Sequence, residues 1–231
     1  MQPRVKFIVP SYEQVAKKVY DTIKELGKDY KAIVFVKLPN YLVVEALNKK
    51  FDDVKEGLIR EIKKYHNIEE LEKTKNKLEQ VWNKFNDIYF ENIKKITGFD
   101  FKYNEYIVYF TDIVRGSYEG GTNQVYVDFH INYERTSFII CEEIFHLHYW
   151  EIYKKIVKNT KYPWVDKDIW EISETIPDFI FLNQLFNEFE WFEGLHRNYS
   201  FISERKKMLQ PIWDNKKDFK DFMIKIHEEL F

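Results

Sequence analysis

The residues with the clearest chemical content lie in one segment, from Ser137 to Lys155. This segment is apolar around most of a helical circumference, yet it carries two adjacent carboxylates, Glu142 and Glu143, and the imidazole of His146. At about 100° per residue, the three side chains fall within one arc of a helix. Burying two carboxylates side by side is costly, so a cation, a shared proton or a partner must compensate them.

Metal binding would remove this cost directly. Glu142 and His146 are four residues apart, so both side chains can point at one ion, with Glu143 beside them. A second acidic pair, Glu174 and Asp178, whose members are four residues apart, follows in a later apolar segment of helical character. Acidic pairs on two neighbouring apolar helices predict a metal site between those helices.

Hydrophobic periodicity predicts the elements that must position these residues. Helices are expected over 11–26, 40–50, 53–65, 68–96, 135–158, 166–183, 184–197, 199–209 and 214–230. Strands are expected over 30–37, 106–110 and 125–129. The loop 115–123 holds three of the seven glycines and joins the last two strands, so it predicts a hairpin and a flexible rim for the site. The expected fold is α+β, mostly helical, with a small sheet of about three strands.

Composition excludes several classes of protein. Seven glycines and six prolines in 231 residues exclude collagen-like chains and sandwiches of many short strands. The 36 basic and 38 acidic residues nearly cancel, so no nucleic-acid partner is expected. No apolar run is long enough for a signal peptide or a membrane span, and the single cysteine, Cys141, cannot form an intrachain disulfide. These features predict a cytoplasmic protein. No linker divides the chain, so one domain is expected over 1–231.

Two motifs resemble the zinc metallopeptidases called gluzincins, whose pattern is H-E-x-x-H on one helix and E-x-x-x-D on a later one. They are Glu142-Glu143-Ile144-Phe145-His146 and Glu174-Thr175-Ile176-Pro177-Asp178. The expected order of elements is similar to a minimal zincin: a long backing helix, a small sheet ending in an edge strand, the motif helix and a helical C-terminal part. The resemblance covers approximately residues 68–200, with an N-terminal α/β segment and C-terminal helices as additions to this zincin-like core.

The resemblance implies a role for each matching residue. His146 would be the second histidine ligand, and Glu174 would be the carboxylate ligand. Glu143 would be the general base that acts on metal-activated water. Asp178 would lie behind the ligands and support them.

The resemblance also implies how a peptide or protein substrate would bind. The strand Val125–Phe129 would be the sheet edge that pairs with an extended peptide. The strand residues that would contact the peptide are Val125, Tyr126 and Val127. Either His196 or Tyr199 would steady the developing oxyanion, a choice that no motif fixes.

One position departs from the gluzincin pattern, because Glu142 stands where the first histidine is expected. Zinc accepts carboxylate ligands, so Glu142, His146 and Glu174 with a water molecule would bind one divalent metal, with zinc preferred and manganese or iron as alternatives. Two anionic ligands would activate water less strongly than a His₂Glu site. The sequence therefore predicts a peptidase-like, metal-dependent hydrolase that is atypical, or an inactive relative that holds no metal.

Two other interpretations use the same residues. Glu143/His146 and Glu193/His196 are both E-x-x-H pairs, and two such pairs build the di-metal carboxylate site of ferritin-like bundles. Only 18 residues separate Glu174 from Glu193, and the expected strands do not belong in a bundle, so the zincin-like interpretation ranks higher. The second alternative is a non-enzymatic protein that binds a partner through exposed aromatic side chains, with the carboxylates exposed or paired to Lys and Arg.

Overall fold

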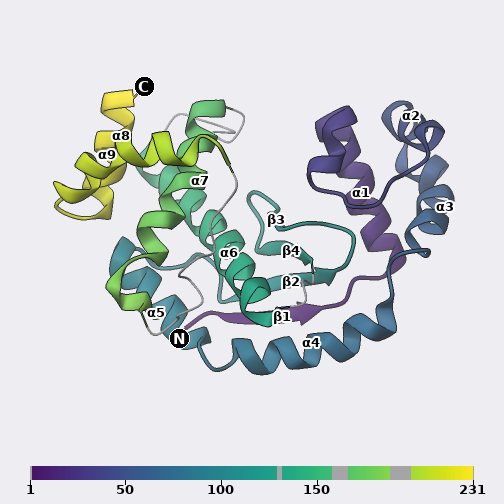
Figure 1. Ribbon diagram of the computed structural model, residues 1–231, viewed down its shortest axis with the longest axis horizontal. Helices are drawn as coiled ribbons and strands as arrows, with labels where there is room; N and C mark the ends of the chain where they lie inside the picture. Colours follow the sequence, from purple (N-terminus) through teal and green to yellow (C-terminus); the bar gives the residue numbers. More distant parts are fainter. Residues whose placement is uncertain (1, 129–131, 158–165, 188–198, 231) are drawn as a thin grey trace.

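A small mixed sheet lies at the centre of the protein (Figure 1). The computed structural model describes residues 2–128, 132–157, 166–187 and 199–230. The strands are β1 (Arg4–Ile8), β2 (Glu105–Thr111), β3 (Ser117–Tyr118) and β4 (Gln124–Asp128), in the order β1-β2-β4-β3. β1, β2 and β4 are parallel, whereas β3 runs antiparallel to β4 at one edge of the sheet.

Helices account for most of the described residues. Before β2 they are α1 (Tyr12–Leu26), the 3₁₀ helix η1 (Gly27–Ala32), α2 (Asn40–Asn48), α3 (Phe51–Ile62), α4 (Ile68–Trp82) and α5 (Asn86–Thr97). After β4 they are α6 (Tyr133–Ile156), α7 (Lys167–Phe181), the 3₁₀ helix η3 (Gln184–Phe186), α8 (Ile202–Asp214) and α9 (Phe219–Leu230). The predicted α+β, mostly helical fold is confirmed. Within the described ranges, no helix has the length and apolar character needed to cross a bilayer.

Polar caps begin the two helices that carry the candidate site. The side chain of Asn132 accepts a hydrogen bond from the Glu134 N–H at 2.8 Å, at the start of α6. The carboxylate of Asp166 accepts hydrogen bonds from the N–H groups of Asp168 and Ile169, at the start of α7. These side chains satisfy backbone donors that have no partner within the helix, so they fix where each helix begins.

The alternation of side chains along the strands divides the core between the two faces of the sheet. Tyr106, Val108 and Phe110 of β2 point into a large apolar cluster with α4 to α9. Tyr109 of β2 and Tyr126 of β4 point the other way, toward a smaller cluster built by α1, α2 and α3. Figure 1 shows α1–α3 gathered at one end of the molecule and α7–α9 at the other.

Two element predictions are wrong at the N-terminal side. The segment 30–37 is not a strand: η1 covers its beginning, and only Val34 forms an isolated bridge, to Val114. The chain instead places a strand at Arg4–Ile8, where the sequence pattern was too short to predict one. The expected helix over 68–96 is two helices, α4 and α5, separated at residues 83–85.

The predicted hairpin between the second and third expected strands is also wrong, because β2 and β4 are parallel neighbours. The chain leaves the sheet after β2, where the Phe35 N–H donates to the Ile113 carbonyl and the Arg115 N–H donates to the Ile33 carbonyl, both at 2.8 Å. It then returns as β3, so the hairpin is formed by β3 and β4. This detour makes β3, and not β4, the edge of the sheet.

A buried histidine, His66, contacts residues at the junction between the N-terminal helices and the sheet. The His66 side chain is fully buried, and its Nδ1 lies 2.7 Å from Asp112 Oδ1. Its Nε2 lies 3.0 Å from the carbonyl oxygen of Pro10. His66 therefore joins the connection between α3 and α4 to the ends of both β1 and β2.

A second buried histidine generates a prediction about acid stability. His148 of α6 stacks on Phe101 with 4.1 Å between the ring centroids, and its Nε2 lies 3.3 Å from Thr97 Oγ1. Burial and, to a smaller extent, the nearby charge of Lys155 lower the pKa of His148 to about 3. The neutral ring is thus favoured in the folded state, whereas the unfolded chain takes up a proton near pH 6.5.

We expect the contribution of His148 to stability to be complete above pH 6.5 and lost progressively as the pH falls from about 6.5 toward about 3. The loss should be about 1.4 kcal/mol in the free energy of unfolding for each pH unit. His148→Phe keeps the stacked ring and removes the titration. Urea unfolding at pH 7, 6 and 5 should therefore show a flatter pH dependence for the variant. Parallel curves for the two proteins would contradict this expectation.

Candidate active site

The candidate site lies where α6, α7 and β3 meet, and its centre is a pair of buried side chains. His146 Nε2 of α6 lies 3.5 Å from Glu174 Oε1 of α7, and the two residues are 2% and 8% exposed. This spacing is longer than an N–H···O hydrogen bond of about 2.7–3.2 Å. It is close to the separation of about 3.3 Å that a tetrahedral ion with bonds of about 2.0–2.1 Å imposes on two of its ligand atoms.

Tyr118 of β3 lies beside this pair. Its ring centroid is 5.2 Å from that of His146, and its hydroxyl oxygen accepts a hydrogen bond from Trp150 Nε1 at 2.8 Å. Burial raises the pKa of Tyr118, and the carboxylates of Glu174 and Glu143 raise it further. The phenol therefore keeps its proton at neutral pH. The sequence offered no signal for this residue, because it belongs to a two-residue strand inside a predicted loop.

Glu143 of α6 lies next to the residue that precedes the edge strand. Its carboxylate lies against Gly116, where an added Cβ would be 2.8 Å from Glu143 Oε1. Lys18 of α1 approaches the same region, with its Nζ 4.7 Å from the centre of the Tyr126 ring. Burial lowers the pKa of Lys18, while the carboxylates of Glu119 and, more weakly, Glu143 oppose that effect. Sequence reasoning missed Lys18, because it lies in a helix far away along the chain.

Glu142 occupies a different environment from Glu143. It is 9% exposed, and its carboxylate adds to the effect of burial in raising the pKa of Cys141 and of Tyr89 from α5. Within the described residues, no three His, Cys, Asp or Glu side chains are grouped as a metal ion would require. The structure therefore brings His146 and Glu174 together but does not assemble the predicted three-ligand set with Glu142.

Asp178 lies on the surface between two helices. Its Oδ2 is 3.4 Å from Lys206 Nζ of α8, and its side chain is 28% exposed. Pro177 does not end α7, which continues to Phe181. Glu174 and Asp178 thus share one helix, as the sequence predicted, but the ion pair of Asp178 is with α8.

The predicted peptide-binding strand needs a correction. Val125 of β4 is paired on both sides, with Val108 of β2 and with Tyr118 of β3. Tyr126 points to the opposite face, where it stacks on Tyr109, and Val127 is fully buried. Because β3 pairs with Val125 and Tyr126, these two residues do not form an open edge that could pair with a peptide. The edge belongs to β3.

The two candidates for oxyanion stabilisation differ in what the structure shows of them. His196 lies outside the described residues, as does Glu193 of the di-metal alternative. Tyr199 is 46% exposed and stacks on Phe201 with 5.2 Å between ring centroids. Its ring also packs against Trp170 at 5.8 Å. Tyr199 is thus part of an aromatic group next to α7.

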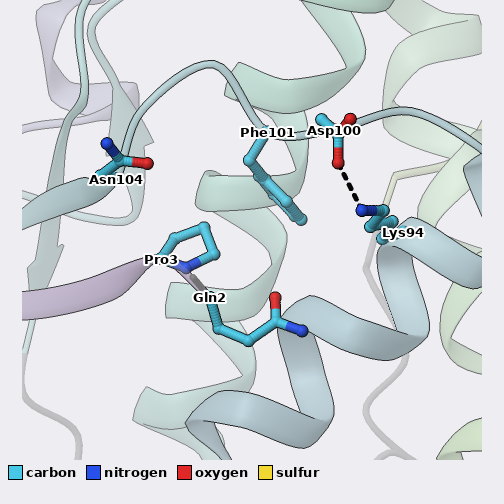
Figure 2. Close-up of a pocket in the computed structure, with 6 residues that line it drawn as sticks. All are labelled: Gln2, Pro3, Lys94, Asp100, Phe101 and Asn104. Atoms are coloured by element: carbon cyan, nitrogen blue, oxygen red, sulfur yellow. Dashed lines mark ion pairs between the residues drawn. The ribbon is translucent and has the colours of Figure 1, made fainter.

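A pocket lies at a distance from these residues in the fold, at the amino ends of β1 and β2 (Figure 2). Its volume is about 440 Å³, and its lining residues are Gln2, Pro3, Lys94, Asp100, Phe101 and Asn104. Lys94 and Asp100 form an ion pair at 2.5 Å across one side. None of the predicted site residues lines it, so this pocket is not the candidate active site.

Comparison with known proteins identifies no relative. The chain matches no protein-family model, and no curated protein and no solved structure matches it. Its function must therefore be inferred from its own residues and their geometry.

The contact between Gly116 and Glu143 predicts the effect of a single methyl group. In Gly116→Ala the new Cβ would lie 2.6 Å from Ile139 Cγ2 and 2.8 Å from Glu143 Oε1. We expect this overpacking to lower the free energy of unfolding by about 1–3 kcal/mol. Gly57→Ala is the matched control, because its Cβ would meet only the flexible end of Leu42 at 2.9 Å. Equal urea midpoints for the two variants would contradict the expectation.

Proposed function

We propose that this protein is a zincin-like, metal-dependent hydrolase that acts on an extended peptide. The observation that carries the proposal is the 3.5 Å spacing between His146 Nε2 and Glu174 Oε1, two buried donor atoms from separate helices. The order of elements supports it: α4 and α5 pack behind the sheet, an antiparallel strand forms its edge, and α6 and α7 follow.

The donor atoms fit a divalent ion with two protein ligands. Imidazole nitrogen and carboxylate oxygen both suit zinc, and manganese accepts the same pair. They do not fit the closed three-ligand site of the H-E-x-x-H pattern, because Glu142 is not grouped with them among the described residues. A bound ion would act as a Lewis acid that polarises a carbonyl group and makes water more acidic. Two protein ligands imply weaker binding than three.

The protein's own groups supply the remaining functions. The outer edge of β3 can pair with the backbone of an extended peptide, as sheet edges do in other peptide-binding proteins. Glu143 is the general base: its carboxylate lies at this edge, where Gly116 leaves room for it, and it can take a proton from water. The proton then passes from Glu143 to the amine that leaves. The Tyr118 ring packs beside His146 and holds the imidazole in place.

The alternatives are less well supported by the described residues. The di-metal interpretation depends on Glu193 and His196, which lie outside them. The partner-binding interpretation expects the acidic residues to be exposed or paired with basic side chains. Neither Glu142 nor Glu174 is exposed, and Glu174 faces His146.

Metal analysis tests the ion site. Purified wild-type protein should retain zinc or manganese, and His146→Ala and Glu174→Gln should each lower the affinity at least tenfold, because each removes one of two ligands. Asp178→Asn is the matched control for Glu174→Gln: it makes the same kind of change one turn further along α7 and should retain the ion. Elemental mass spectrometry and titration calorimetry give the readouts. Equal metal content in wild type and His146→Ala would overturn the site.

Peptide cleavage tests the hydrolase. A random library of N-acetylated hexapeptide amides, analysed by mass spectrometry, should show cleavage by the zinc-loaded wild type. Glu143→Gln should reduce the rate by about 10²–10⁴-fold, because it removes the general base. It should keep the bound ion. Glu119→Gln changes another carboxylate near β3 and should retain activity. A Glu143→Gln protein as active as wild type would exclude this role.

A further inference from the structure

The hydrogen bond between Trp150 and Tyr118 fixes which way the Tyr118 hydroxyl can act. An indole N–H can only donate, so Trp150 Nε1 occupies a lone pair of the Tyr118 oxygen at 2.8 Å. A hydroxyl has one proton of its own, which must point elsewhere. The structure shows no acceptor for this proton among the residues that it describes. Tyr118 is therefore an oriented donor.

The position of this donor connects it with the site. Tyr118 lies in β3, the edge strand, and its ring is next to His146. The Tyr118 side chain as a whole is half-buried. Burial and the carboxylates of Glu174 and Glu143 raise its pKa, which keeps the proton on the oxygen.

We infer that the Tyr118 hydroxyl donates a hydrogen bond to a carbonyl oxygen of the peptide bound along β3. The assignment rests on the proposed function, because it needs a peptide at this edge. It replaces Tyr199 in the role that the sequence left open, since Tyr199 is an exposed member of an aromatic group.

This placement has a direct chemical consequence. As water adds to the carbonyl carbon, negative charge develops on the carbonyl oxygen, and a donor already aimed at that oxygen stabilises the charge. The proton stays on Tyr118 throughout, so the residue gives a hydrogen bond and not a proton. The Trp150 N–H holds the phenol oxygen, so little reorientation is needed during the reaction.

The experiment measures peptide binding and cleavage separately, with the same library of N-acetylated hexapeptide amides and the zinc-loaded full chain. Peptides retained by the wild type are labelled, and their Kd values are measured by fluorescence anisotropy. Tyr118→Phe should raise Kd roughly threefold to tenfold, the effect of one neutral hydrogen bond. It should lower kcat by roughly 10²–10³-fold.

Three further proteins serve as controls. Tyr103→Phe removes a hydroxyl that donates to the Gly121 carbonyl on the neighbouring loop, and it should bind as the wild type does. Tyr199→Phe should do the same. A chain with 3-fluorotyrosine at position 118 keeps the donor and should bind at least as tightly as wild type. Comparison with this protein distinguishes loss of the hydroxyl from disturbed packing of the ring. It remains informative if Tyr118→Phe does not fold.

The outcomes separate this inference from the proposed function. Unchanged Kd in Tyr118→Phe, or no peptide retained by the wild type, would overturn the role of Tyr118. Cleavage that depends on Glu143 but not on Tyr118 would overturn the inference and leave the hydrolase proposal standing. Peptide binding that depends on Tyr118, without any cleavage, would support the inference and overturn the hydrolase proposal.

Discussion

The passage of one helix through the apolar core is the constraint on which the rest of the structure depends. Fifteen of the 24 residues of α6 are buried, and Glu142, His146 and His148 are among them. Burying an ionisable group costs free energy unless the group stays neutral or contacts a polar partner. His148 stays neutral against Phe101, His146 meets Glu174 from α7, and the neighbouring elements are placed so that these contacts are possible.

Local pattern was enough to predict the helices but not the sheet. The apolar stripes that bury α6 and α7 are periodic along the chain, so the sequence located both helices. Strand neighbours are set by contacts between distant residues, and periodicity cannot report those. The sequence therefore did not predict the chain path after β2, where Ile33 and Phe35 form backbone hydrogen bonds. It also did not predict that Tyr118 lies in the edge strand. The environment of Glu142 was missed for a related reason, since α5 contributes Tyr89 beside it.

Different side chains approach the candidate site on the two faces of the sheet. On the face that packs on α6, the Tyr118 ring lies beside His146 of the buried pair. The opposite face packs on α1–α3 and contributes Lys18, which reaches the same edge over the Tyr126 ring.

The contact between His66 and Pro10 brings together the two ends of the segment that holds α1–α3. The unit 12–62 leaves the sheet just after Pro10 and returns at His66, and these two points are joined by a hydrogen bond of 3.0 Å. A segment whose ends meet can be inserted into a host fold without stretching it. α1–α3 have the geometry of such an insert, and the apolar cluster that they build also includes Ile113, Val114 and Tyr126.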